Sequence, residues 1–241
     1  MISLSIVIPA YNEEKRLPAT LDRVLAFLAA RPWTFSEVIV VDDGSRDGTG
    51  AQVESYSATR RPIRLLRNPG NRGKGYSVRH GMTEARGDWT LFSDADLSTP
   101  IEEFDKLLDA ARDAGAEVAI GSRALDRSLI SVRQPVVREC SGRFFNVVMR
   151  AATGLPFRDT QCGFKLFAGP ARREIFRRQR LDGFGFDVEA LFIARRLGFP
   201  VVEVPVRWAD VEGTKVSALR GLDAFADIAR VRWNALSGRY E

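Results

Sequence analysis

The feature that most restricts the fold of this chain is the regular alternation of short apolar strands with amphipathic helical stretches. Residues 38–41 are all β-branched, which is typical of a parallel strand buried on both faces of a sheet. In residues 17–30 the apolar side chains recur instead at the spacing of one helix face. Repeated strand–helix units of this kind predict an α/β fold with a mostly parallel, doubly wound central sheet flanked by helices.

The alternation continues along most of the chain. Strands are expected at 4–8, 38–41, 63–66, 91–92, 118–120, 164–167 and 201–206. Helices are expected near 17–30, 47–58, 75–86, 101–114, 187–197 and 218–237. The segment 123–160, which is rich in Arg and Phe, breaks this rhythm. Because no linker or shift of composition separates two halves, the 241 residues are expected to form a single domain.

Two carboxylates follow the fourth expected strand, one residue apart. In strand geometry alternate side chains point the same way, so Asp94 and Asp96 are expected to leave the sheet on one side. Two such oxygen donors suit a hard divalent cation whose remaining ligands are water and phosphate oxygens. On these residues alone, a solvated strand end that caps the next helix is an equally good interpretation.

Polar loops follow the first three strands as well, and they decide between these interpretations. Their candidate residues are Pro9, Tyr11 and Glu13 after the first strand, Asp42 and Asp43 after the second, and Gly73 and Lys74 after the third. Each loop alone could be an ordinary turn, but the carboxyl edge of an α/β sheet is where ligands bind. A carboxylate there suits a ribose or a base N–H, and a Lys between glycines suits a pyrophosphate. The sequence therefore predicts a nucleotide-diphosphate site.

Several other classes are excluded or disfavoured. The phosphate loop of common ATPases and the Gly-x-Gly-x-x-Gly signature of dehydrogenases are both absent from the corresponding loops. The net charge of +5 suits nucleotides, phosphates or an anionic membrane surface, and is not by itself a nucleic-acid-binding composition. Cys140 and Cys162 have no metal-ligand spacing and are expected to be reduced thiols in a cytosolic protein. No stretch reaches the roughly 18 apolar residues of a membrane span, so membrane contact is expected to be peripheral.

The strand-end motifs resemble the inverting family-two glycosyltransferases of the GT-A fold. The matching stretches are 6–13, 40–45, 71–75 and 93–96. Three later stretches, 121–123, 159–167 and 186–189, resemble more narrowly the dolichyl-phosphate β-glucosyltransferases within that family. The resemblance extends from residue 3 to about 236. It implies one Rossmann-like GT-A domain, with a nucleotide-sugar-binding half at 1–122 and an acceptor-binding half at 123–241.

The resemblance also implies a reaction. A hexose, expected to be glucose from UDP-glucose, would pass with inversion to a polyprenyl (dolichyl-type) phosphate, with Mg²⁺ or Mn²⁺ as the cofactor. A phosphate monoester with a second pKa of about 6 is largely a dianion near neutral pH and needs no strong base. Lys74 and the metal on Asp94 and Asp96 would stabilise the leaving diphosphate, and Arg123 would hold the acceptor phosphate.

The resemblance further assigns roles to individual residues. Catalysis is expected from Asp96, Asp187, Lys74 and Arg123, although whether Asp187 acts as a base stays open. Substrate contacts are expected from Pro9, Tyr11, Glu13, Asp42, Asp43, Gly73, Lys74, Asp94, Ala95, Arg123, Arg138, Asp159, Gln161 and Lys215. Among these, Arg138 would share the acceptor phosphate, Asp159 and Gln161 would shape the sugar pocket, and Lys215 would lie on a lid loop.

Access to a lipid acceptor requires contact with a membrane. Segment 129–150 mixes aromatic and aliphatic residues with arginines, which suits an interfacial element near acidic lipid. Helix 218–237 is expected to be an ordinary core-packing helix. The expected location is cytoplasmic, peripherally associated with the membrane. Two alternatives stay open: a related family-two transferase that uses a hydroxyl acceptor, and a nucleotide-sugar-binding protein without catalysis.

Overall fold

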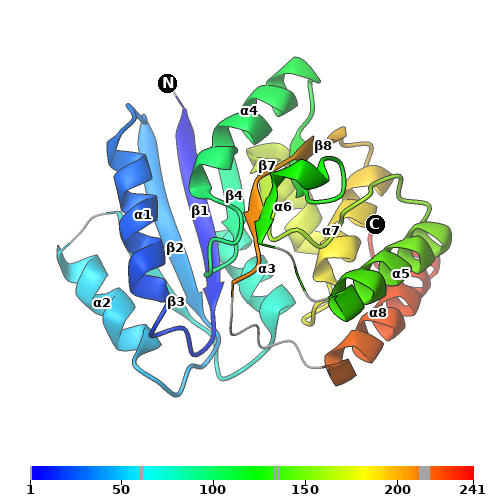
Figure 1. The fold of residues 1–241 in the computed structure, drawn as a ribbon, viewed down its shortest axis with the longest axis horizontal. Coiled ribbons are helices and arrows are strands. Elements are labelled where there is room, and N and C mark those ends of the chain that lie inside the picture. Colours follow the sequence, from blue (N-terminus) through cyan, green and yellow to red (C-terminus); the bar gives the residue numbers. More distant parts are fainter. Residues whose placement is uncertain (1, 60–61, 133, 135, 212–217) are drawn as a thin grey trace.

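The computed structural model describes residues 2–59, 62–132, 134, 136–211 and 218–241, apart from the side chains of 136–141, 143–145 and 218–225. Its centre is a sheet of seven strands (Figure 1). In spatial order they are β3 (Ile63–Arg67), β2 (Phe35–Asp42), β1 (Ser3–Ala10), β4 (Trp89–Ser93), β7 (Phe164–Ala168), β5 (Val118–Ser122) and β8 (Val201–Pro205). Within this sheet β7 runs antiparallel to both of its neighbours, and the other pairs are parallel. The predicted mostly parallel α/β architecture is confirmed.

Helices cover both faces of the sheet because alternate strand residues point to opposite sides. Ile6 and Ile8 of β1 join one apolar cluster, and Val7 joins the other. The first cluster includes residues of α1 (Leu17–Ala29), α2 (Thr49–Thr59) and α4 (Phe104–Asp113). The second includes residues of α3 (Lys74–Glu84), α6 (Gly169–Arg178) and α7 (Phe186–Arg196).

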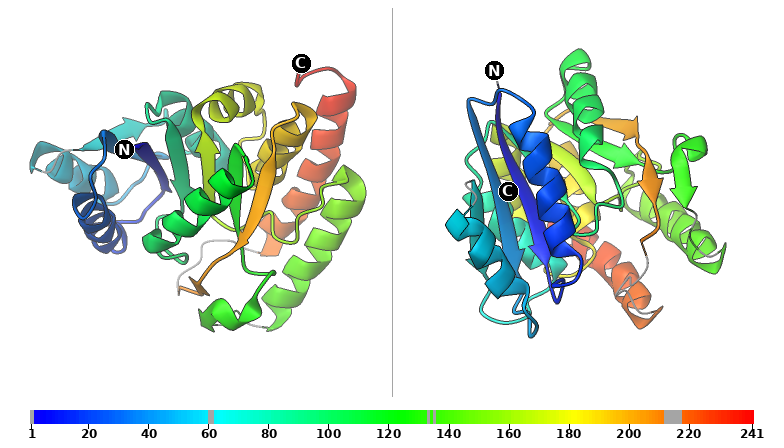
Figure 2. Two further views of the ribbon diagram at one scale, coloured as in Figure 1. Left: turned by 90° about the horizontal axis from the view of Figure 1, so that it is seen from above. Right: turned by 60° about the vertical axis from the view of Figure 1, so that its left-hand side comes forward.

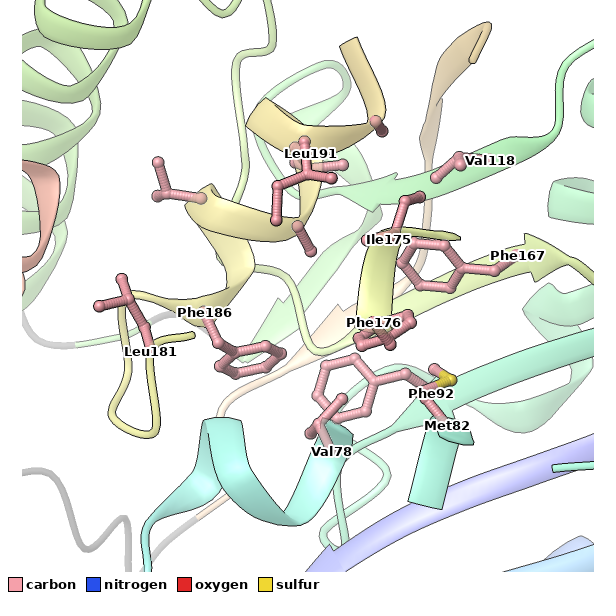
Figure 3. Close-up of a cluster of buried hydrophobic side chains, with 14 of the residues drawn as sticks. Val78, Met82, Phe92, Val118, Phe167, Ile175, Phe176, Leu181, Phe186 and Leu191 are labelled. Carbon is pink, nitrogen blue, oxygen red and sulfur yellow. The ribbon is translucent and has the colours of Figure 1, made fainter. Parts of the chain in front are cut away.

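The second cluster packs the start of α7 against β4, close to the carboxyl end of that strand. Figure 3 shows Phe92 of β4 beside Phe186, the first residue of α7, with Val78 of α3 close by. The rings of Phe92 and Phe186 meet edge to face, with their centroids 5.6 Å apart. This apolar contact fixes the start of α7 against the strand that carries the paired aspartates.

Two long helices form the far end of the molecule. α5 (Val136–Thr153) and α8 (Ala218–Leu236) lie side by side, beyond the strands of the sheet (Figures 1 and 2). Over the part of the chain that is described, no helix combines the length and the apolar character needed to cross a membrane.

All the predicted strands and helices are present, but four elements were missed. The longest is α5, which lies inside the segment 123–160 that was expected only to break the strand–helix rhythm. Another is α6, whose apolar residues are few among its arginines and which begins beside Pro170. The others are the short strands β6 (Ile130–Val132), preceded by a single turn at Arg127–Leu129, and β9 (Trp208–Ala209), which pair with each other. The reversed direction of β7 was not predicted either, because an apolar run does not encode whether its neighbours are parallel.

Candidate active site

A cleft of about 820 Å³ opens at the carboxyl ends of β1, β2 and β4. Nine of the residues predicted to form the site line it: Pro9, Tyr11, Glu13, Asp43, Gly73, Lys74, Asp94, Ala95 and Asp96. The loops after four different strands therefore meet in one hollow, as strand-end reasoning anticipates.

Lys74 and the two aspartates form the charged centre of the cleft. The Nζ atom of Lys74 lies 2.7 Å from Oδ1 of Asp94. Burial opposes the charged form of Lys74, but the Asp94 and Asp187 carboxylates outweigh it and raise the pKa of this ammonium group. Burial and then the neighbouring Asp94 raise the pKa of Asp96. The cleft thus holds a charged lysine beside two carboxylates, and Asp94 disfavours the ionisation of Asp96.

The backbone around Asp96 turns sharply. Leu97 has a φ of 46°, in the left-handed region that side chains other than glycine rarely adopt. This turn lets the amide of Ser98 donate a hydrogen bond to Oδ1 of Asp96 at 2.9 Å. The carboxylate of Asp96 is therefore oriented by the loop that follows it.

The paired aspartates fit a divalent cation. They offer hard oxygen donors and an excess of negative charge, and a cation would relieve the repulsion between them. Gly163, whose carbonyl accepts a hydrogen bond from the amide of Asp94 at 3.1 Å, makes room for this arrangement. A Cβ atom at position 163 would overlap the Asp94 carboxylate. Within the described ranges no cluster of three or more His, Cys, Asp or Glu side chains forms, so other ligands would come from substrate and water.

A second cleft, of about 130 Å³, shares Asp94 and Asp96 with the first. Its lining also includes Arg123 and Gln161, both predicted site residues, together with Trp208. The Arg123 guanidinium lies over the Trp208 ring, 5.4 Å from its centroid. The two aspartates consequently stand at the junction of a large compartment and a small one.

Asp159 lies behind Arg123 and binds its guanidinium through both carboxylate oxygens. Its carboxylate accepts hydrogen bonds from Nε and Nη2 of Arg123 at 2.7 and 2.8 Å. Burial opposes ionisation of Asp159, but Arg123 outweighs it and lowers the pKa of this carboxyl. Glu203 of β8 in turn accepts hydrogen bonds from the amides of Arg158 and Asp159. Asp159 was predicted to shape the sugar pocket, yet it lines neither of these two clefts, and its carboxylate is used by Arg123.

Asp187 is also placed behind the site. Only 4% of it is exposed, and it lines neither cleft. Its Oδ1 atom accepts a hydrogen bond from Nζ of the equally buried Lys165 at 2.5 Å. Burial raises the pKa of Asp187, against the opposing effects of Lys165 and Lys74. Sequence reasoning missed Lys165, although a single charge inside the apolar run 164–167 was a usable signal.

One further predicted residue, Asp42, is not brought to either cleft, and two more fall outside what the structure describes. Asp42 is buried, lines neither cleft, and accepts a hydrogen bond from the amide of Ser45 at 2.9 Å. Asp42 therefore holds its own turn, whereas its neighbour Asp43 reaches the cleft. Arg138 falls in α5 at a position whose side chain lies outside the description, and Lys215 lies outside the described residues.

One wall of the large cleft was missed entirely. It consists of residues 180–184, between α6 and α7. Buried Glu189 accepts hydrogen bonds from the amides of Arg180 and Leu181 at 3.0 and 2.8 Å, which fixes the start of this wall. Asp227 of α8 accepts one from the amide of Gly185 at 3.1 Å, which fixes its end. The closely spaced glycines at 183 and 185 were the available sequence signal for a special loop.

Comparison with known proteins identifies the family. Residues 5–176 match the sequence model described as Glycosyl transferase family 2. A dolichyl-phosphate beta-glucosyltransferase of Drosophila melanogaster is 41% identical over 228 residues, covering 90% of this chain and 70% of that protein. The enzyme of the same name from Homo sapiens is 36% identical over 253 residues, covering 98% and 77%.

Solved structures agree on the fold. Glucosyl-3-phosphoglycerate synthase from Mycobacterium tuberculosis, in complex with Mn²⁺, UDP-glucose and phosphoglyceric acid, superimposes with a TM-score of 0.66. The match covers 95% of this chain and 79% of that one at 20% identity. The fold and the family expected from the sequence are confirmed. The chain belongs to glycosyl transferase family 2, among the hexosyltransferases that include the dolichyl-phosphate β-glucosyltransferases.

Proposed function

We propose that this protein transfers glucose from UDP-glucose, with inversion, to a polyprenyl (dolichyl-type) phosphate at the cytoplasmic face of a membrane, to which it binds peripherally. The observation that carries the proposal is the position of Asp94 and Asp96 between two clefts of very different volume. An inverting displacement needs the nucleophile and the leaving group on opposite sides of the reacting carbon. We infer that the two compartments that share these aspartates hold the donor and the acceptor phosphate on these two sides.

In this proposal the large cleft binds the nucleoside diphosphate. Its volume of about 820 Å³ suits a ligand of that size. Lys74 would donate hydrogen bonds to the diphosphate as negative charge develops on it. Asp94 and Asp96 would hold a divalent cation, Mg²⁺ or Mn²⁺, which would supply charge neutralisation on the same group. The solved relative that holds Mn²⁺ and UDP-glucose supports this choice of metal and donor.

Arg123 is proposed to bind the acceptor phosphate in the small cleft. Asp159 takes up Nε and Nη2 of its guanidinium, which leaves Nη1 as a donor for a phosphate oxygen. Trp208 and Asp159 together restrict the rotation of this side chain. The phosphate reacts as a dianion, so Asp187, in its buried ion pair, need not remove a proton. On this account residues 1–122 bind the donor and residues 123–241 form most of the acceptor side.

The proposal is tested by product analysis. Purified protein is incubated with radiolabelled UDP-glucose, Mn²⁺ or Mg²⁺, and either a polyprenyl phosphate or the matching free polyprenol in detergent. We expect label in the organic phase only with the phosphate, and release of glucose from that product by mild acid. An acid-stable product made from the polyprenol would establish the hydroxyl-acceptor alternative. Binding of UDP-glucose without any transfer would establish the non-catalytic one.

A further inference from the structure

The turn that carries Lys74 is in close contact with the wall formed by residues 180–184. A Cβ atom at Gly75 would lie 2.5 Å from the carbonyl oxygen of Leu181 and 2.7 Å from that of Gly183. A Cβ atom at Gly73 would overlap the carbonyl of Asp182. Sequence reasoning gave these glycines the task of admitting a pyrophosphate. In the structure they let the two backbone segments pack directly on each other.

Gln179 lies at the joint between these two segments. Only 1% of the residue is exposed. Its Nε2 atom donates to the carbonyl of Gly75 and to the carbonyl of Leu181, both at 2.9 Å. Gln179 and Gly75 are 104 positions apart in the chain. One buried amide group therefore joins the residue after Lys74 to the opposite wall of the cleft.

The other side of the turn is held by Asp43. Its carboxylate accepts hydrogen bonds from the amides of Arg72 and Gly73 at 2.9 and 2.8 Å. Lys74 thus lies between two buried anchors, Asp43 at the end of β2 and Gln179 after α6. The wall to which Gln179 ties it is itself fixed, because Glu189 holds the amides of Arg180 and Leu181.

We propose that Gln179 is a positioning residue for Lys74, and this inference rests on the proposed function. Lys74 is a long, flexible side chain, so the place where its Nζ atom meets a diphosphate depends on the backbone from which it extends. Without the Gln179 amide, Gly75 loses its tie to the wall and the turn can shift. A displacement of about 1 Å at a reacting group can lower a rate about a hundredfold.

The test is a double-mutant cycle between Gln179→Met and Lys74→Met. Methionine has a similar length but no donor, and Oε1 of Gln179 has no hydrogen-bond partner among the described residues, so its loss is neutral. We expect Gln179→Met alone to lower kcat/KM for UDP-glucose between about tenfold and a hundredfold. In the Lys74→Met background the same change is expected to cost less than about twofold, because residues that act through one another are not additive.

Where turnover is too slow to follow, the same double-mutant cycle can be measured with the affinity of each variant for UDP, determined by calorimetry. The matched control is Ser57→Ala, which removes a side-chain hydrogen bond to the carbonyl of Ile63 at 2.9 Å, away from both clefts. It is expected to lower the melting temperature without changing kcat/KM. If Gln179→Met does not fold, Gln179→Asn keeps the amide on a shorter chain and is expected to show the same coupling.

Equal losses in both Lys74 backgrounds would overturn the proposal, as would a folded Gln179→Met protein with unchanged kcat/KM and UDP affinity. The Lys74→Met variant alone tests the proposed function itself. If Lys74→Met leaves UDP affinity and turnover intact, the role of Lys74 is wrong, whatever Gln179 does.

Discussion

Asp159 holds both Nε and Nη2 of Arg123, at 2.7 and 2.8 Å, from a position behind the small cleft. The cation proposed to meet the acceptor phosphate is therefore already oriented, and partly neutralised, by a buried carboxylate. An arginine fixed in this way offers the acceptor phosphate the remaining N–H groups of its guanidinium in a set orientation, rather than a freely moving charge. Recognition of the acceptor thus depends on a residue that need not contact it.

Replacing Asp159 with Asn is expected to affect the acceptor far more than the donor. The KM for polyprenyl phosphate should rise about tenfold or more, with little change for UDP-glucose. The free energy of unfolding should fall by about 2–3 kcal/mol, because Arg123, whose side chain is 26% exposed, loses its counterion. Steady-state kinetics and urea unfolding measure both effects. Glu54→Gln, which breaks an exposed ion pair with Arg67, is the control and should change stability by less than about 1 kcal/mol.

The same pair predicts a dependence of stability on pH. The pKa of Asp159 is lower in the folded protein than its unfolded value of about 3.9. Its contribution is fully present above about pH 4 and is lost as the pH falls through the lower folded value. The difference in unfolding free energy between the native protein and Asp159→Asn should therefore shrink on acidification below about pH 4. A difference that stays constant from pH 6 to pH 3 would contradict this assignment.

Gly163→Ala is expected to disrupt the metal site while leaving the fold intact. The added methyl group would occupy space now filled by the Asp94 carboxylate, which must then rotate away. Affinity for Mn²⁺ in the presence of UDP should fall about tenfold to a hundredfold. Calorimetry with and without a chelator separates this loss from any change in binding of UDP alone. Unchanged Mn²⁺ affinity would remove Asp94 from the metal site.

Asp187→Asn distinguishes a buried structural ion pair from a catalytic base. Loss of the carboxylate leaves Lys165, which is 1% exposed, without its counterion, so the free energy of unfolding should fall by about 3–5 kcal/mol. Adding Lys165→Met should recover part of this loss. At a temperature where the variant is folded, kcat plotted against pH should still show an acidic limb, that is, a fall in kcat towards low pH. Disappearance of that limb, with stability preserved, would show that Asp187 is the base.

Tyr240→Phe is expected to weaken the wall of the large cleft from a distance. The Tyr240 hydroxyl donates to Glu189 at 2.7 Å, and Glu189 fixes the amides of Arg180 and Leu181. The free energy of unfolding should fall by about 1–2 kcal/mol, and the KM for UDP-glucose should rise. Tyr56→Phe, which alters a hydroxyl bonded to Asp22 near the surface, is the comparison. It should leave the KM for UDP-glucose unchanged.

The sequence was most informative where chemistry follows a parallel strand. Asp94, Asp96 and Lys74 could be placed together because the ends of neighbouring parallel strands share one edge. The spacing of apolar residues located most of the strands and helices, since burial of one face gives each type of element its own period.

The sequence was least informative about which polar side chains turn inward. Asp42 and Asp43 are adjacent and chemically identical, yet one holds its own turn and the other lines the cleft. Gln179 and Glu189 act through hydrogen bonds to backbone groups, and such contacts leave no motif in a single sequence. The wall at 180–184 is defined by these long-range contacts, so only the folded chain reveals it.

The reversed direction of β7 explains why one motif precedes its strand while the others follow theirs. Because β7 enters the sheet where its neighbours leave it, residues 159–163 arrive at the cleft before the strand begins. Gln161 and Gly163 reach the small cleft in this way, and Asp159 reaches Arg123 behind it. Because one strand is antiparallel, side chains can reach this edge of the sheet from a segment that precedes a strand as well as from loops that follow one. Changes in the segment before β7 can therefore alter the acceptor side without changing the donor loops.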